Sequence, residues 1–337
     1  MWSKKGSDPG VTFWLGRAYK QVTETQPEDI LMRFNRHLLI FFLLILPISA
    51  VSALRPDDLP NTSKWYFHVD FKEMRTSEAG KHLYAWLQDE VFEDIREDTG
   101  VDLDMEADYL TAFATTDSGQ IIIIEGNISQ QTEDKIVAMG AASGSLDRLG
   151  SGDKAFYHVK DDDRVSINGG DIEFDIDSFD DGAYFSFAVR NKLIVTSTRE
   201  LMEELLDNKG RVKGLRGGKG QLFILSADRN FMQAGANTAD FDGWDSNILR
   251  NAQQAALLVA ANSSGQIAIE VQLVTSEAEM ADSLASIARG LISLQVFNED
   301  MDPEIANFLQ NTKVGVDGNK LTINVALDPE EVVAAIE

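Results

Sequence analysis

Residues 112–123 read AFATTDSGQIII, and residues 258–269 read LVAANSSGQIAI. Each stretch consists of an apolar, β-prone run, a polar turn that ends in glycine, and a second β-prone run. This order is typical of a β-hairpin, in which a short turn joins two antiparallel strands. The sequence therefore predicts two hairpins, one in each half of the chain, which align with each other without a gap.

A second pair of matching segments follows the predicted hairpins. Residues 191–196 read NKLIVT and residues 319–324 read NKLTIN, and each is followed by acidic residues in the first turn of an expected helix. Negative charge at that position complements the helix dipole. Two matches in the same order predict that the chain contains two copies of one unit.

Each predicted copy has the order strand, helix, hairpin, helix, hairpin, helix. Opening strands are expected at 65–71 and 221–225. A long helix in each copy is expected to cover one face of a sheet, because its apolar residues recur at three-and-four spacing. The predicted fold class is α+β, with two tandem copies of a mainly antiparallel sheet unit covered by helices. The apolar residues of the two helices are Leu83, Trp86, Leu87, Val91 and Ile95, and Met280, Leu284, Ile287, Leu291 and Leu294.

The predicted domain organisation places the first copy at 54–208 and the second at 221–337. Between them, residues 209–220 read KGRVKGLRGGKG, a glycine-rich and basic segment. Glycine-rich segments of this kind behave as flexible linkers. We expect the basic charges of this linker to lie against acidic surfaces beside it.

The N-terminal part of the chain resembles a secretory leader. Residues 38–53 form an almost unbroken apolar run after a basic segment, and the small or aliphatic residues Val51, Ser52 and Ala53 predict cleavage after Ala53. Met32 is then the expected true start, with residues 1–31 as an upstream extension. The alternative is an uncleaved anchor, although these 16 residues are fewer than the roughly 20 of a membrane-spanning helix.

Composition restricts the class of protein further. The 337 residues include 30 Lys plus Arg and 55 Asp plus Glu, which gives a net charge of −25. Such a surface repels phosphate backbones, so a nucleic-acid partner is not expected. The absence of cysteine excludes disulfides, thiolate catalysis and a cysteine-linked lipid anchor. With the leader, these features predict a periplasmic or secreted bacterial protein; the alternative is an inner-membrane protein anchored by residues 38–53 and facing the periplasm.

Two acidic clusters are candidates for binding a metal ion. In the first, Asp171, Glu173, Asp175 and Asp177 alternate with apolar residues, which is typical of a half-buried strand. Four carboxylates on one face repel each other, and Ca²⁺ or the basic linker would relieve that repulsion. Otherwise no cofactor is expected. The second cluster admits the same two interpretations, a calcium loop or a strand entry with one exposed face; it consists of Asp102, Asp104, Glu106 and Asp108.

Two further pairs of residues are candidates for function. His68 and Asp70 lie two positions apart on an expected strand, so their side chains share a face. Such a pair can act as base and orienter in a hydrolase, or can simply lie at the edge of a core. Phe241 and Trp244 lie in a polar loop, where they form either a contact surface for a ligand or partner, or an anchor of that loop.

The segment Gly100-Val101-Asp102, which leads into an expected strand at Tyr109-Leu110, together with the leader and the duplicated plan, resembles exported bacterial proteins of unknown function. The resemblance implies a fold and no particular activity. We predict a soluble envelope protein without enzymatic activity, which binds an envelope protein or a small ligand in a groove between the two copies. The alternatives are a calcium-stabilised acidic module and a hydrolase that uses His68 and Asp70.

Overall fold

The computed structural model combines helices with one large antiparallel sheet, which confirms the predicted α+β class. All but the end of the last described helix fall in one compact unit, Ile45–Ala334. The leader at residues 1–53 and most of the linker lie outside the described residues. The structure describes residues 63–115, 119–142, 146–160, 182–212, 220–236, 252–296 and 309–336.

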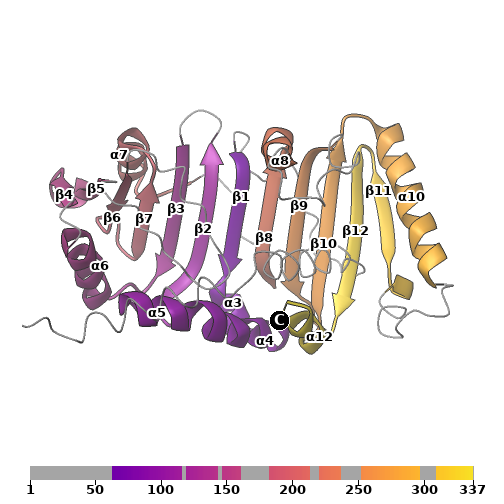
Figure 1. Cartoon of the computed structure of the whole chain (residues 1–337), viewed down its shortest axis with the longest axis horizontal. Helices are drawn as coiled ribbons and strands as arrows, with labels where there is room; N and C mark the ends of the chain where they lie inside the picture. The colour runs from indigo at the N-terminus through magenta and orange to yellow at the C-terminus, as the bar shows by residue number, and fades with distance from the viewer. Residues whose placement is uncertain are drawn as a thin grey trace, which may run out of the picture. The chain divides into compact units, whose positions relative to one another are not determined.

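Twelve strands of the described chain form a single sheet (Figure 1), and their order across it is β11-β12-β10-β9-β8-β1-β2-β3-β7-β6-β5-β4. Every neighbouring pair runs antiparallel. The strands are β1 (Ser63–Asp70), β2 (Ala107–Thr115), β3 (Gly119–Gly126), β4 (Leu146–Leu149), β5 (Phe156–Val159), β6 (Ala183–Ser186), β7 (Lys192–Thr196), β8 (Gln221–Asp228), β9 (Ala252–Ala261), β10 (Ile267–Thr275), β11 (Lys313–Asp317) and β12 (Lys320–Leu327).

Both predicted hairpins are present. Phe113 of β2 lies opposite Ile121 of β3, and Val259 of β9 lies opposite Ile269 of β10. The glycine at the end of each turn has a positive φ, 104° at Gly119 and 81° at Gly265. Glycine adopts this left-handed conformation without the steric cost that a Cβ atom imposes, which explains why both turns use it.

The two predicted opening strands, β1 and β8, pair with each other within the sheet. Trp65 lies opposite Ala227 and Val69 lies opposite Phe223. From this pair outward, one side of the sheet has the order β1-β2-β3-β7-β6 and the other has the order β8-β9-β10-β12-β11. The sheet is therefore continuous across the junction of the two predicted copies.

The helices of the described chain cover parts of this sheet and one end of its strands. α7 packs on β6 and β7, α8 on β1, β8 and β9, and α10 on β10, β11 and β12. Figure 1 shows α10 beside β11 at one edge of the sheet. The first predicted long helix is interrupted by a π-helical segment, η2. The helices are α3 (Phe71–Thr76), α4 (Glu78–Leu87), η2 (Gln88–Phe92), α5 (Glu93–Thr99), α6 (Gln130–Ala142), α7 (Arg199–Asp207), α8 (Arg229–Ala236), α10 (Ala278–Val296) and α12 (Pro329–Ile336), with a 3₁₀ turn at Gly152–Lys154.

The larger hydrophobic core lies under α7 and extends across the β1–β8 pair. It joins Met202 of α7 to Ile194 of β7 and Tyr66 of β1, all fully buried. It continues through Ile224 of β8 to Leu258 of β9. A smaller core lies between α10 and its strands and includes Ala285 and Leu321. Burial of these side chains provides the main favourable term in folding.

The prediction for the apolar face of α10 was wrong in part. Leu284 packs against the smaller core as expected, but the three apolar residues that follow it in the row are exposed. Ala281 and Ala285 are fully buried instead. These small side chains face the sheet, and the longer side chains of the row lie on the other side of the helix. The exposed fractions are 51% for Ile287, 56% for Leu291 and 72% for Leu294.

None of the helices in the described ranges is long and apolar enough to span a membrane.

Candidate functional site

Six of the predicted site residues lie outside the described residues. They include the acidic cluster proposed for Ca²⁺ and the proposed aromatic contact surface, so both sites stay predictions. Within the ranges that the structure describes, no group of three or more His, Asp or Glu side chains is placed to hold a metal ion. The six residues are Asp171, Glu173, Asp175, Asp177, Phe241 and Trp244.

His68 lies inside the sheet rather than at an open site. Its side chain is 3% exposed, and its Nδ1 atom is 2.9 Å from the Thr111 hydroxyl on the neighbouring strand β2. Its ring stacks between those of Tyr66 and Tyr109, with centroids 6.4 Å and 6.2 Å away. These contacts make His68 a link between β1 and β2.

Asp70 begins helix α3. Its Oδ1 atom accepts a hydrogen bond of 2.7 Å from the backbone N–H of Glu73, which is the usual contact of a helix N-cap. Burial raises the pKa of Asp70, and the negative charges of Glu73 and Asp108 add to this effect, while the hydrogen bond opposes it. Thus the described contacts of His68 and Asp70 lead to different elements, β2 and α3.

Arg75 organises the acidic stretch at 102–108. Its Nη1 atom donates to the carbonyl oxygens of Asp104 and Ala107, both at 2.9 Å. Its Nη2 atom is 2.5 Å from the Asp108 carboxylate. A guanidinium group fits this task because its donors lie in a fixed planar fork. The spacing of the carboxylates in the sequence could not reveal Arg75, since it lies 29 residues before Asp104.

Two side chains of α4 and η2 also hold Asp104. The Tyr84 hydroxyl contacts the Asp104 carboxylate and is 2.6 Å from its carbonyl oxygen. Gln88 Nε2 donates to the second carboxylate oxygen at 2.8 Å. Burial, together with the hydrogen bond to Asp104, raises the pKa of Tyr84 to about 12. The second acidic cluster is therefore tied to the helices by protein donors.

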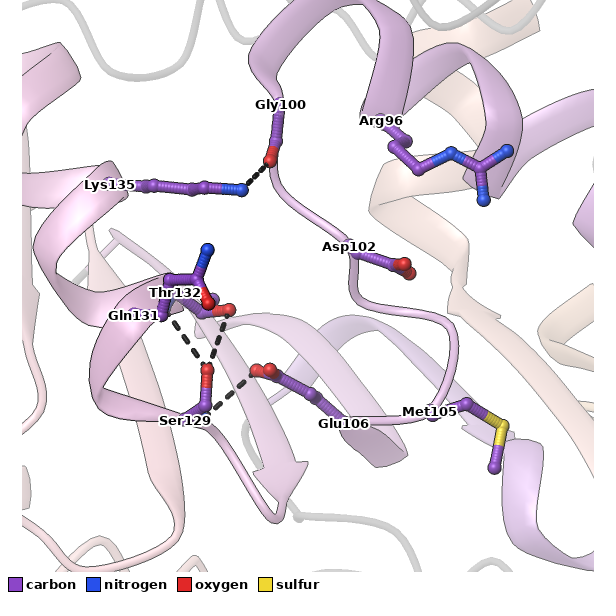
Figure 2. Close-up of a pocket in the computed structure, with 9 residues that line it drawn as sticks. All are labelled: Arg96, Gly100, Asp102, Met105, Glu106, Ser129, Gln131, Thr132 and Lys135. Atoms are coloured by element: carbon purple, nitrogen blue, oxygen red, sulfur yellow. Dashed lines mark hydrogen bonds between the residues drawn. The ribbon is translucent and has the colours of Figure 1, made fainter.

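A pocket of about 520 Å³ lies beside this stretch, between the C-terminal end of α5 and the first turns of α6 (Figure 2). Glu106 forms one wall, and its carboxylate accepts a 3.0 Å hydrogen bond from the Ser129 N–H at the start of α6. Burial alone would raise the pKa of Glu106, but hydrogen bonds from Ser129 and Thr132 and the charge of Lys135 lower it overall. The anion position at this helix N-terminus is thus occupied by the chain's own carboxylate.

The opposite wall of the pocket is also held by internal contacts. Lys135 of α6 donates to the carbonyl oxygen of Gly100 (Figure 2). Gly100 ends α5 with a φ of 67°, and its N–H donates to the Arg96 carbonyl oxygen at 2.9 Å. Arg96 in turn pairs with Glu93 on the same helix. The contact between Lys135 and the Gly100 carbonyl oxygen thus links α6 to the end of α5, and Glu106 is held by the Ser129 N–H.

The exposed apolar residues of α10 form the second candidate site. We refer to Ile287, Leu291 and Leu294 as the α10 row. Their spacing of four and three residues places them on one side of the helix. Of the seven large apolar side chains that are exposed in the described chain, these are the only three on one element. Groups of exposed apolar side chains mark surfaces that bind other molecules.

No family model, curated protein or solved structure matches this chain.

Proposed function

We propose that this protein is exported to the bacterial envelope and acts there by binding another protein through the α10 row, without catalysis. The observation that supports binding is the exposure of the row, in which each side chain keeps 51% to 72% of its surface in water. Complete burial of a Leu or Ile side chain is worth roughly 1.5–3 kcal/mol. A partner that covers the row would gain a substantial part of that free energy for each of the three residues.

The sequence supports the location. The apolar run at 38–53, preceded by basic residues, has the order of a secretory leader. The net charge of −25 keeps the protein dispersed, so a single apolar row can be exposed at low risk of aggregation. Cleavage after Ala53 would release the protein, whereas an uncleaved leader would anchor it with its folded part facing the periplasm.

We also propose that the two halves of the sheet are copies of one unit. The order of strands outward from the β1–β8 pair is the same on both sides through five strands. The hydrogen bonds after the hairpins also correspond. Gly126, at the end of β3, donates to the Asn191 carbonyl oxygen at 3.1 Å, and Thr275, at the end of β10, donates to the Asn319 carbonyl oxygen at 2.9 Å.

Site-specific cross-linking in living cells tests the binding function. A photoreactive amino acid replaces Leu291 in the α10 row, or Asp282, which is exposed on another side of α10. We expect a discrete cross-linked product from position 291 and none from position 282. Adding Ile287→Ser and Leu294→Ser should lower the yield at 291 at least about fivefold, since the apolar contact is lost. Equal yields from both positions would refute the proposal.

Cell fractionation tests the location. The folded protein should be recovered with periplasmic proteins or from the medium, or with the inner membrane if the leader is kept. Recovery in the cytoplasm would contradict export.

A further inference from the structure

We infer that the occupant of the α10 row is a basic amphipathic helix of another protein; this inference rests on the binding function proposed above. The shape of the row is the first support. Its residues recur at i, i+4 and i+7 on a 19-residue helix, so they form a ridge nearly parallel to the helix axis. Helices that bind helices use ridges of this spacing.

Small residues beside the row leave space for a second helix. Gly290 lies next to the row on the outer side of α10, and a Cβ atom added there would meet nothing within 4 Å. Ser283, one turn before Ile287, is exposed on the same side. A partner helix can therefore place its side chains against the ridge without displacing any bulky group of α10.

The distribution of charge decides among possible occupants. The described sequence of α10 contains no acidic residue after Asp282, so the row itself is a neutral strip. The first turn of α10 carries the exposed carboxylate of Glu279, and the chain as a whole has a net charge of −25. The best complement is a helix with an apolar centre and basic flanks. A second copy of this chain or an anionic membrane would instead be repelled.

Arg289 does not reverse this charge pattern. Its guanidinium group donates to the carbonyl oxygen of Val314 in β11 at 2.9 Å. It is thereby directed toward the sheet edge and fixes α10 against β11. The only basic side chain in the last three turns of the described helix is thus engaged within the protein.

A labelled helical peptide tests the inference on the full chain. The probe has 18 residues, Leu at heptad spacing and Lys elsewhere, and its affinity is measured by fluorescence anisotropy. The row variant carries Ile287→Ser, Leu291→Ser and Leu294→Ser. It should bind at least about tenfold more weakly than the natural chain, because the apolar contact is removed while the charge is unchanged. Raising the salt concentration should weaken binding to the natural chain, since the flanking charges are screened.

Matched controls separate the ridge from general electrostatics. Ser286→Ala, about 100° around the helix from Ile287, should bind the peptide within about twofold of the natural chain. A peptide with Glu in place of Lys, and a scrambled Leu–Lys peptide, should bind at least about tenfold more weakly than the probe. Equal affinity of the natural chain and the row variant for the probe would overturn the inference, because surface charge alone would then account for binding.

The other outcomes are also decisive. The row residues are exposed, so the row variant should keep its circular dichroism spectrum; if it loses this spectrum, Leu294→Ser alone should still weaken binding at least about threefold. If the natural chain sediments as a dimer and the row variant as a monomer, the occupant is a second copy of this chain, and the inference is overturned. Cross-linking at position 291 without peptide binding would refute the basic helix and leave the proposed binding function intact.

Discussion

Glu270 is the one acidic residue that is buried in the described chain, with 5% of its surface exposed. It lies on β10, where its Oε1 atom accepts a 2.5 Å hydrogen bond from Gln272. Burial raises the pKa of Glu270, and this effect exceeds the opposing effects of the Gln272 hydrogen bond and the Lys320 charge. The ionised carboxylate therefore costs stability in the folded state.

The raised pKa predicts how Glu270→Gln changes stability with pH. Since the pKa is higher in the folded than in the unfolded state, the stability contributed by the protonated group is complete below the unfolded pKa, near pH 4, and is lost as the pH rises through the folded pKa. Glutamine is neutral and still accepts from Gln272. The variant should melt above the natural protein at pH 8, and the difference should disappear near pH 4. A lower melting temperature of the variant at pH 8, followed by circular dichroism, would contradict this.

The contacts of single residues show which features of the candidate sites the sequence could not predict. The alternation of carboxylates at 102–108 is visible in the sequence and admits a metal site. Its actual partner, Arg75, comes from a helix 33 residues before Asp108. Likewise, His68 and Asp70 share a strand, but His68 contacts Thr111 on β2 and Asp70 contacts the start of α3. Spacing along the chain carries no information about such non-local partners.

At the scale of elements, replacing glycine with alanine should have opposite effects on stability at two positions. A Cβ atom at Gly126, which ends β3, would lie 1.9 Å from the Glu106 carbonyl oxygen and 2.7 Å from the Asp108 nitrogen. Both are backbone atoms, so Gly126→Ala should destabilise the protein by about 2 kcal/mol or more. Gly290→Ala, within α10 and open to solvent, should stabilise it by about 0.5–1 kcal/mol. Urea unfolding of both variants measures the two values; a shift of the same sign in both would contradict the prediction.

The elements that the sequence predicts well are those with local causes. The hairpins at 112–123 and 258–269 are found because a polar turn and its glycine lie between adjacent strands. The sequence does not predict which face of α10 packs on the sheet, because two sides of this helix carry apolar residues. Two fully buried alanines, Ala281 and Ala285, lie on the side that faces the sheet. The hydrophobic spacing instead predicts burial of the larger side chains of the α10 row.

At the scale of the whole molecule, the pairing of β1 with β8 is the feature that no local pattern indicates. It joins strands that begin 158 positions apart, at Ser63 and Gln221, through backbone hydrogen bonds. The larger core also extends across this strand pair, because Tyr66 and Phe113 belong to one cluster with Ile224 and Leu258. The two predicted copies therefore share a sheet and a core, although the linker between them resembles a domain boundary in sequence.

This shared core predicts one cooperative unfolding transition. Ile224, fully buried in β8, and Leu201, at 5% exposure in α7, belong to the same cluster but to different halves of the chain. Truncating either to alanine should cost about 2–5 kcal/mol, because each leaves a cavity in that core. Both variants should lower the same single transition in scanning calorimetry, with equal calorimetric and van't Hoff enthalpies. If the halves were independent, two transitions would appear and Leu201→Ala would shift only one of them, which would show that the continuous sheet does not couple the halves.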